Sequence, residues 1–135
     1  MLNSGVCLPF RIARAILVLM LGIASQYAPG RMAEVIRVRQ TRPTAHPLPI
    51  ELPPTDGYIA VLDCSQIGNI WHLQHQGVVE SFLVVDCAGD LATKQWMLRN
   101  NILVEVDHAT AERWHTVGHG AQIEVVLPSG RDFPY

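Results

Sequence analysis

The segment FLVVDCAGDLATKQWMLRNNILVEVDHATAERW, residues Phe82–Trp114, decides the fold. It contains two apolar runs, Phe82–Val85 and Ile102–Val106, which are rich in β-branched residues and are separated by a stretch with helical spacing. Apolar runs of this length and composition are typical of buried strands. Each run is followed by or ends beside an aspartate, Asp86 or Asp107. We expect both aspartates at strand ends, where partial burial can tune the pKa of a carboxyl group.

Further short elements are predicted on both sides of this segment, starting at Gly57. The predicted strands are Tyr58–Leu62, Ile70–Gln74, Val79–Val85, Ile102–Val106 and Gln122–Leu127. The predicted helices are Leu91–Asn100, with Leu91, Met97 and Leu98 on its buried side, and Ala109–Trp114. Short strands joined by small helical crossovers favour a compact, mainly β barrel over a doubly wound sheet.

Length, composition and charge limit the classes of function. The chain has 135 residues, of which 49% are hydrophobic, so it is long enough for one domain with a packed core. Its formal net charge is −2 at pH 7, and only Lys94, Arg99 and Arg113 are basic between Gly57 and Leu127. Because a nucleic-acid surface needs clustered Lys and Arg, we expect no nucleic-acid partner.

The first 24 residues have the pattern of a secretory signal. Arg11 and Arg14 precede an unbroken apolar run, Ala15–Ala24, in which Gly22 and Ala24 have the small-x-small spacing of a signal-peptidase site. A run of this length is too short to span a bilayer, which takes about 20 residues. We therefore expect export with cleavage after Ala24, and an uncleaved N-terminal anchor or a buried helix are the alternatives. Cleavage would remove two arginines and no acid, moving the net charge from −2 to −4.

Residues 25–56 have a different composition from the rest. Between Arg31 and Arg42, four arginines accompany a single acid, Glu34, and five prolines occur within TRPTAHPLPIELPPTDG. Proline fixes φ and removes a hydrogen-bond donor, so these residues are predicted to form a basic and then proline-rich linker. Contact of the basic part with anionic lipid or wall polymer is the alternative to a simply solvated linker. Residues 57–127 would then form the barrel, and residues 128–135 a polar tail.

Two cysteines, Cys64 and Cys87, would remain after Cys7 leaves with the signal segment. An even pair in an exported chain favours a disulfide, which would close a loop of about 24 residues and contribute about 3 kcal/mol. Two buried free thiols are the alternative. No CxxC partner accompanies either cysteine, so the pair alone does not indicate a metal site.

From Tyr58 to Leu127, the order of segments resembles the double-psi β-barrel of the rare lipoprotein A, barwin and expansin group. The similar parts are the glycine turn and strand in IGNIWHL, the strand in FLVVDCAGD, the aspartate and helix in VEVDHATAERW, and the glycine turn and strand in VGHGAQIEVV. The Asp-Cys step in VVDCAG is especially similar to barwin-type segments. The resemblance implies a small six-stranded double-psi β-barrel with one or two short helices.

The resemblance also implies a function at the cell wall. The group includes lytic transglycosylases that cut peptidoglycan, expansins that loosen walls without hydrolysis, and binding modules. The resemblance implies catalytic roles for Asp86 and Asp107, with peptidoglycan or another extracytoplasmic glycan as the partner. No cofactor is expected, and contact with a membrane is expected only through the N-terminal segment. The chain lacks several loop motifs of the lytic enzymes, so a non-catalytic wall-binding or glycan-binding module and a protein-interaction module are the alternatives.

Cleaving a glycosidic bond needs a carboxylic acid with a raised pKa, which protonates the leaving oxygen. Asp107 is the expected acid, because an apolar strand and a small-residue helix would desolvate it, and Asp86 would hold or polarise the sugar. His108 is placed to tune Asp107 and to contact substrate. The alternative is structural, with Asp107 as the N-cap of the helix Ala109–Trp114 and Asp86 as a turn cap.

Aromatic and histidine side chains complete the set of candidates. Trp71 begins an alternating strand and is predicted to be a platform for a sugar ring, whereas Trp96 and Trp114 have positions that suit core packing. The spacing His72-x-x-His75 invites a metal interpretation. However, residues three apart on a strand point to opposite faces, so no metal is expected.

Overall fold

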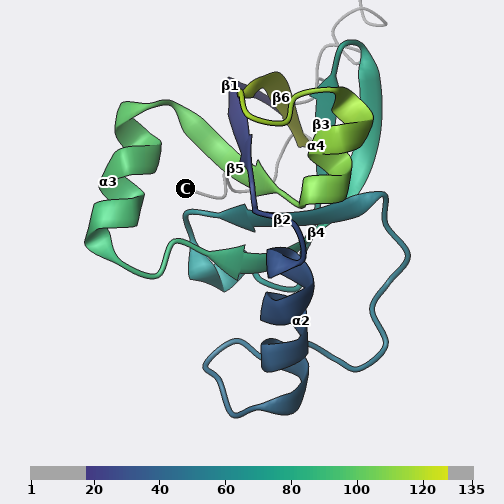
Figure 1. Cartoon of the computed structure of the whole chain (residues 1–135), viewed down its shortest axis with the longest axis vertical. Coiled ribbons are helices and arrows are strands. Elements are labelled where there is room, and N and C mark those ends of the chain that lie inside the picture. The colour runs from purple at the N-terminus through teal and green to yellow at the C-terminus, as the bar shows by residue number, and fades with distance from the viewer. Residues whose placement is uncertain (1–17, 128–135) are drawn as a thin grey trace, which may run out of the picture.

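The computed structural model describes residues 18–127, which form a closed β-barrel with three α-helices (Figure 1). The strands are β1 (Val18–Gln26), β2 (Gly57–Val61), β3 (Ile70–His75), β4 (Val78–Cys87), β5 (Ile102–Val106) and β6 (Ala121–Leu127). The helices are α2 (Arg31–Thr41), α3 (Leu91–Arg99) and α4 (His108–Trp114), and a 3-10 turn, η1, spans Cys64–Gln66. Within this range, no helix has the length and apolar character that crossing a membrane requires. Cys7, most of the predicted signal segment and the predicted tail lie outside the described residues.

The six strands follow the order β1-β5-β2-β4-β3-β6, and β6 pairs with β1 to close the barrel. Two of the pairs, β1 with β5 and β2 with β4, are parallel, and each contains one register shift. The remaining pairs are antiparallel. Bulges of this kind increase local twist, which helps a small sheet to close. The prediction of a mainly β, six-stranded barrel is confirmed.

The barrel interior is filled by every second side chain of each strand, the ones that point inward. Trp71 and Phe82 are among the largest fully buried side chains at its centre. On β5, Val104 and Val106 belong to the same interior cluster, and Glu105 between them lies on the outer face. This alternation determines which residues can form a site on the outer face of the barrel.

Between Gly57 and Leu127 the predicted elements agree closely with the structure. One detail of α3 differs: Leu91 and Leu98 were expected on its buried side but are 70% and 66% exposed. Met97 is the buried residue of this helix and packs against β5. The helix therefore projects from the barrel, as Figure 1 shows, and contacts it mainly through Met97.

The strand β1 extends the barrel beyond the boundary expected from the sequence. It lies within the run interpreted as a signal segment, yet pairs in parallel with β5 and in antiparallel with β6. The described barrel therefore begins at Val18 and not at Gly57. A short apolar run suits both a signal segment and a buried strand, so its composition does not distinguish them. Cleavage after Ala24 stays a prediction, and it would remove most of β1.

The predicted linker, residues 25–56, is folded against the barrel. Its helix α2 packs Met32 onto the outer face of β4, where Met32 contacts the cluster that contains Leu83. The proline-rich part folds back on this helix: Leu48 is buried, and its backbone N–H donates to the Arg39 carbonyl oxygen at 3.0 Å. The prediction of an extended linker was wrong for this segment. It was based on the arginines and prolines and did not take account of the apolar residues between them.

A disulfide joins Cys64 to Cys87, with 4.9 Å between the Cα atoms, as the cysteine count predicted. It ties the turn after β2 to the end of β4. A loop of this size makes the cross-link worth about 3 kcal/mol on the chain-entropy model. A disulfide is also typical of an oxidising, extracytoplasmic compartment.

Candidate functional site

The strand register places two carboxyl groups in one row on the outer face of the barrel. Glu105 on β5 lies opposite Ser25 on β1 and opposite Ala60 on β2. Ala60 in turn lies opposite Asp86 on β4. Residues directly opposite each other share a face of the sheet, and two strand spacings put the Cα atoms of the acids about 10 Å apart. Because Ala60 between them carries only a methyl group, the two acidic side chains can converge above it.

A bulge in β4 determines the position of Asp86. The ladder between β2 and β4 passes from Ile59 opposite Val84 directly to Ala60 opposite Asp86, so Val85 is the extra residue. In a regular ladder Val85 would lie opposite Ala60, and Asp86 would lie opposite Val61 instead. The following residue, Cys87, is held by the disulfide. The bulge and the disulfide together fix the end of β4.

The Asp86 carboxylate is held by two donors from the N-terminal part of the chain. The Tyr27 hydroxyl donates to Oδ2 at 2.6 Å, and Nη2 of Arg39 donates to Oδ1 at 2.8 Å. The side chains of Arg39 and Asp86 are only 15% and 18% exposed, so water screens this ion pair less than a pair on the open surface. The Nε of Arg39 is buried and has no hydrogen-bond partner among the described residues. The site therefore retains one unused donor beside Asp86.

The environment changes the proton affinity of the two groups beside Asp86. Burial raises the pKa of Glu105, and the Asp86 charge adds to this shift. Burial and the hydrogen bond to Asp86 also raise the pKa of Tyr27, which therefore keeps its proton and acts as a donor. Glu105 holds its proton to higher pH than a free glutamate does. A carboxyl group with a raised pKa beside a carboxylate with an ion-pair partner is an arrangement suited to acid catalysis.

This row opens into two adjoining cavities of about 290 and 300 Å³. Both are lined by Asp86, Arg31 and Val35, and the second is also lined by Glu105 and Tyr27. The acidic side chains are therefore accessible from solvent beside α2, which lies against β4 in Figure 1. In the described part of the chain, no group of three or more His, Cys, Asp or Glu side chains has the geometry to hold a metal ion.

Asp107 has a structural role, which is the alternative to its role as the acid. Its Oδ2 accepts from the Thr110 N–H at 3.2 Å, and its Oδ1 accepts from the Thr110 hydroxyl at 2.7 Å and the Tyr58 N–H at 2.9 Å. A side chain at Gly57 would collide with both Asp107 and Thr110, so that glycine allows the close approach. Asp107 lines neither cavity beside Asp86, and Glu105 is the acid that the fold brings to Asp86 instead.

Replacing Asp107 by alanine should lower the free energy of unfolding by about 2–4 kcal/mol. The change removes the N-cap of α4 and leaves the Thr110 and Tyr58 donors without their acceptor. Asp107→Asn keeps the Oδ1 acceptor and should cost less than half as much. Urea unfolding of both variants measures the difference. Equal losses for the two variants would contradict the capping role.

The two predicted substrate-binding residues do not lie at this site. Trp71 is 2% exposed and points into the barrel, so it presents no face to a sugar; its neighbour Ile70 is the one on the outer face. His108 begins α4, with Nε2 at 3.7 Å from Glu112 Oε1, and lines neither cavity beside Asp86. Trp114 is buried as predicted, whereas Trp96 is partly exposed.

Three residues of the site were missed in the sequence. Glu105 had a detectable signal, because it is the one charged residue in the apolar run ILVEV. Tyr27 and Arg39 had none, since they reach Asp86 from positions 59 and 47 residues away in the chain. Their approach depends on the pairing of β1 and the packing of α2. Comparisons of the chain with models of protein families, with curated proteins and with solved structures found no match.

Proposed function

We propose that the protein is an exported barrel that binds extracytoplasmic glycan strands of the peptidoglycan type and cleaves them by carboxylate acid catalysis. One observation carries the proposal. Glu105, whose pKa is raised, and Asp86 lie on either side of Ala60 in one row across the sheet, and both line a cavity that is open to solvent. We include in this proposal the double-psi form of the barrel and its relation to the rare lipoprotein A, barwin and expansin group. The two bulged parallel ladders support that form.

Each side chain of the site has a role in the proposed reaction. Glu105 donates its proton to the leaving glycosidic oxygen as the bond to the anomeric carbon breaks. The C6 hydroxyl of the same sugar forms the new bond to that carbon and returns its proton to Glu105, giving a 1,6-anhydro product. Asp86, held by Tyr27 and Arg39, faces the positive charge that develops on the sugar ring. Asp107 takes no part, because it lines neither cavity beside Asp86 and instead caps α4.

The disulfide supports the proposed location outside the cytoplasm. The bond between Cys64 and Cys87 closes beside the proposed site, at the residue after Asp86. Such bonds form and persist in the periplasm or outside the cell, where envelope glycans are found. Export itself is part of the proposal.

A non-catalytic glycan-binding module is the second candidate, and one observation favours it. Asp86 accepts from both Tyr27 and Arg39, so it ties the segment 27–39 to the barrel. A carboxylate with this structural task need not take part in chemistry. In that case the same cavity would bind a sugar without cutting it.

Incubation of the full chain with purified peptidoglycan glycan strands tests the two candidates. Mass spectrometry of the soluble products should detect fragments that end in 1,6-anhydro sugars. Retention on insoluble peptidoglycan without such fragments would favour the binding module. A chain that neither binds the strands nor releases fragments would reject both.

A further inference from the structure

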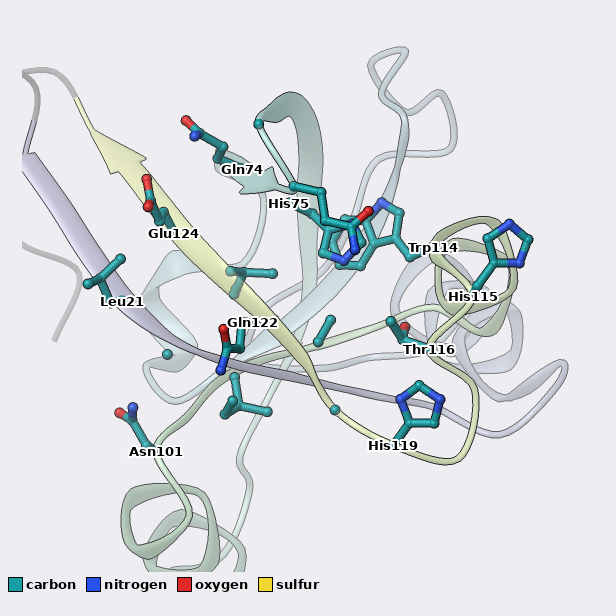
Figure 2. A pocket seen from close by; sticks show the side chains of 17 residues that line it. Leu21, Gln74, His75, Asn101, Trp114, His115, Thr116, His119, Gln122 and Glu124 are labelled. Atoms are coloured by element: carbon teal, nitrogen blue, oxygen red, sulfur yellow. The ribbon is translucent and has the colours of Figure 1, made fainter.

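A larger groove lies along β6, and the proposed reaction does not use it. Its volume is about 940 Å³, and it extends from β1 past the end of β3 to the turn that follows α4 (Figure 2). Neither Asp86 nor Glu105 lines it. The groove is therefore a separate feature of the barrel surface.

One wall of the groove is held rigid by a network of contacts. The His75 ring stacks on Trp114, with 4.4 Å between ring centroids. Trp114 Nε1 donates to Glu80 Oε1 at 2.8 Å, and Glu80 Oε2 accepts from Arg113 Nη2 at 2.6 Å. Burial lowers the pKa of His75, with the Glu80 charge partly opposing, so the ring is neutral near neutral pH. The wall is therefore preformed and offers an uncharged imidazole.

The other lining groups are mainly neutral hydrogen-bonding side chains. In Figure 2 the amides of Gln122 and Asn101 lie towards one end of the groove, near Leu21, and the imidazoles of His115 and His119 lie towards the other. Among residues 18–127, no Lys or Arg lines the groove, and Glu124 is its single acid. The carboxamides that line it are Gln74, Gln76, Asn101 and Gln122.

This lining fits one class of ligand better than others. A carboxamide provides two donors and an acceptor, which complement the hydroxyl and acetamido groups of a neutral sugar. An anionic ligand would need cationic side chains, which the described lining of the groove lacks, and a cationic ligand would need more than one acid. Leu21, which is largely exposed, adds an apolar surface on which sugar C–H groups can pack.

We propose that the groove is an accessory site for neutral sugar units that carry acetamido groups. The inference rests on the proposed function only in that these units would belong to the polymer cut at Glu105. The strand β1 links the two sites: Leu21 lines the groove, and Ser25 on the same face of the strand lies opposite Glu105. At about 3.3 Å per residue, these positions are about 13 Å apart along the strand.

Titration of the full chain with chitohexaose, a neutral acetamido oligosaccharide, tests this site by calorimetry. All measurements carry Glu105→Gln, which prevents cleavage during the titration. The added double substitution Gln74→Ala with Gln122→Ala should raise the Kd about fivefold or more, because hydrogen bonds to the sugar are lost. Gln95→Ala removes the same kind of exposed amide from α3, outside the groove, and should leave the Kd unchanged.

The possible outcomes separate the accessory site from the proposed reaction. Binding that is weakened by the substitutions at Gln74 and Gln122, together with no release of anhydro fragments by wild type, would keep the groove and reject the catalysis. Cleavage by wild type together with a Kd that is unaffected by the groove substitutions would reject the groove alone. Preferential binding of a sulfated oligosaccharide, or no binding of chitohexaose by any form, would also overturn the assignment.

Discussion

Replacing Glu105 by glutamine should slow the proposed cleavage of peptidoglycan strands by about 10²–10⁴-fold, the usual contribution of a general acid. Glutamine keeps the size of the side chain and its place opposite Ser25 and Ala60, but it cannot donate a proton to the leaving oxygen. The measurement is the initial rate of anhydro-product release. Glu51→Gln is the matched control, because Glu51 is exposed and lies outside the cavities, and it should leave the rate unchanged.

The pH dependence distinguishes a proton donor from a residue that only supports the fold. Since the pKa of Glu105 is raised, the wild-type rate should fall as pH rises through that pKa, where the donor loses its proton. The same proton contributes stability that is complete below the unfolded pKa of about 4.3 and is lost as pH rises through the higher folded value. Glu105→Gln should lose both dependences. A fully active variant, or a slow variant with the wild-type pH profile, would refute Glu105 as the acid.

A chain shortened to begin at Ser25 should fail to form the barrel. The deletion removes Val18–Ala24, and with it every residue of β1 that pairs with β6. It also leaves the edge of β6 that faces β1, and part of the edge of β5, without hydrogen-bond partners. We expect that urea unfolding of this chain, monitored by circular dichroism, shows no cooperative transition. Removal of residues 1–14 is the control, because it retains the whole of β1.

This second result bears directly on the predicted signal segment. If the chain is cut after Ala24 in the cell, N-terminal sequencing of the exported protein will find Ser25. A mature protein that begins at Ser25 and unfolds cooperatively would contradict the role of β1 in closing the barrel. A mature protein that retains Val18 would agree with it.

The barrel could be predicted from sequence where strand signals are local. The apolar runs Phe82–Val85 and Ile102–Val106 lie within β4 and β5, and the turn residues between them separate the elements correctly. The strand β1 could not be recognised, because AILVLMLGIA satisfies the pattern of an export signal equally well. Only its long-range pairing with β6 distinguishes the two, and no local pattern encodes that pairing.

The candidate site was predicted in part for the same reason. Asp86 was identified because it follows a buried strand, whereas Asp107 was expected to be the acid and had the capping role only as its alternative. The pairing of Asp86 with Glu105 depends on the extra residue Val85 in a parallel ladder. A shift of one residue in that ladder would place a different side chain opposite Ala60, and sequence spacing does not determine the register.

The seam between β1 and β6 has a consequence for how the chain folds. It pairs Val18 with Leu127, the two ends of the described chain. Contacts between such distant residues carry a large loop-closure entropy and make folding slow. The barrel cannot close during synthesis until its last strand has left the ribosome. Until then, the exposed edges of the other strands are open to pairing with neighbouring chains.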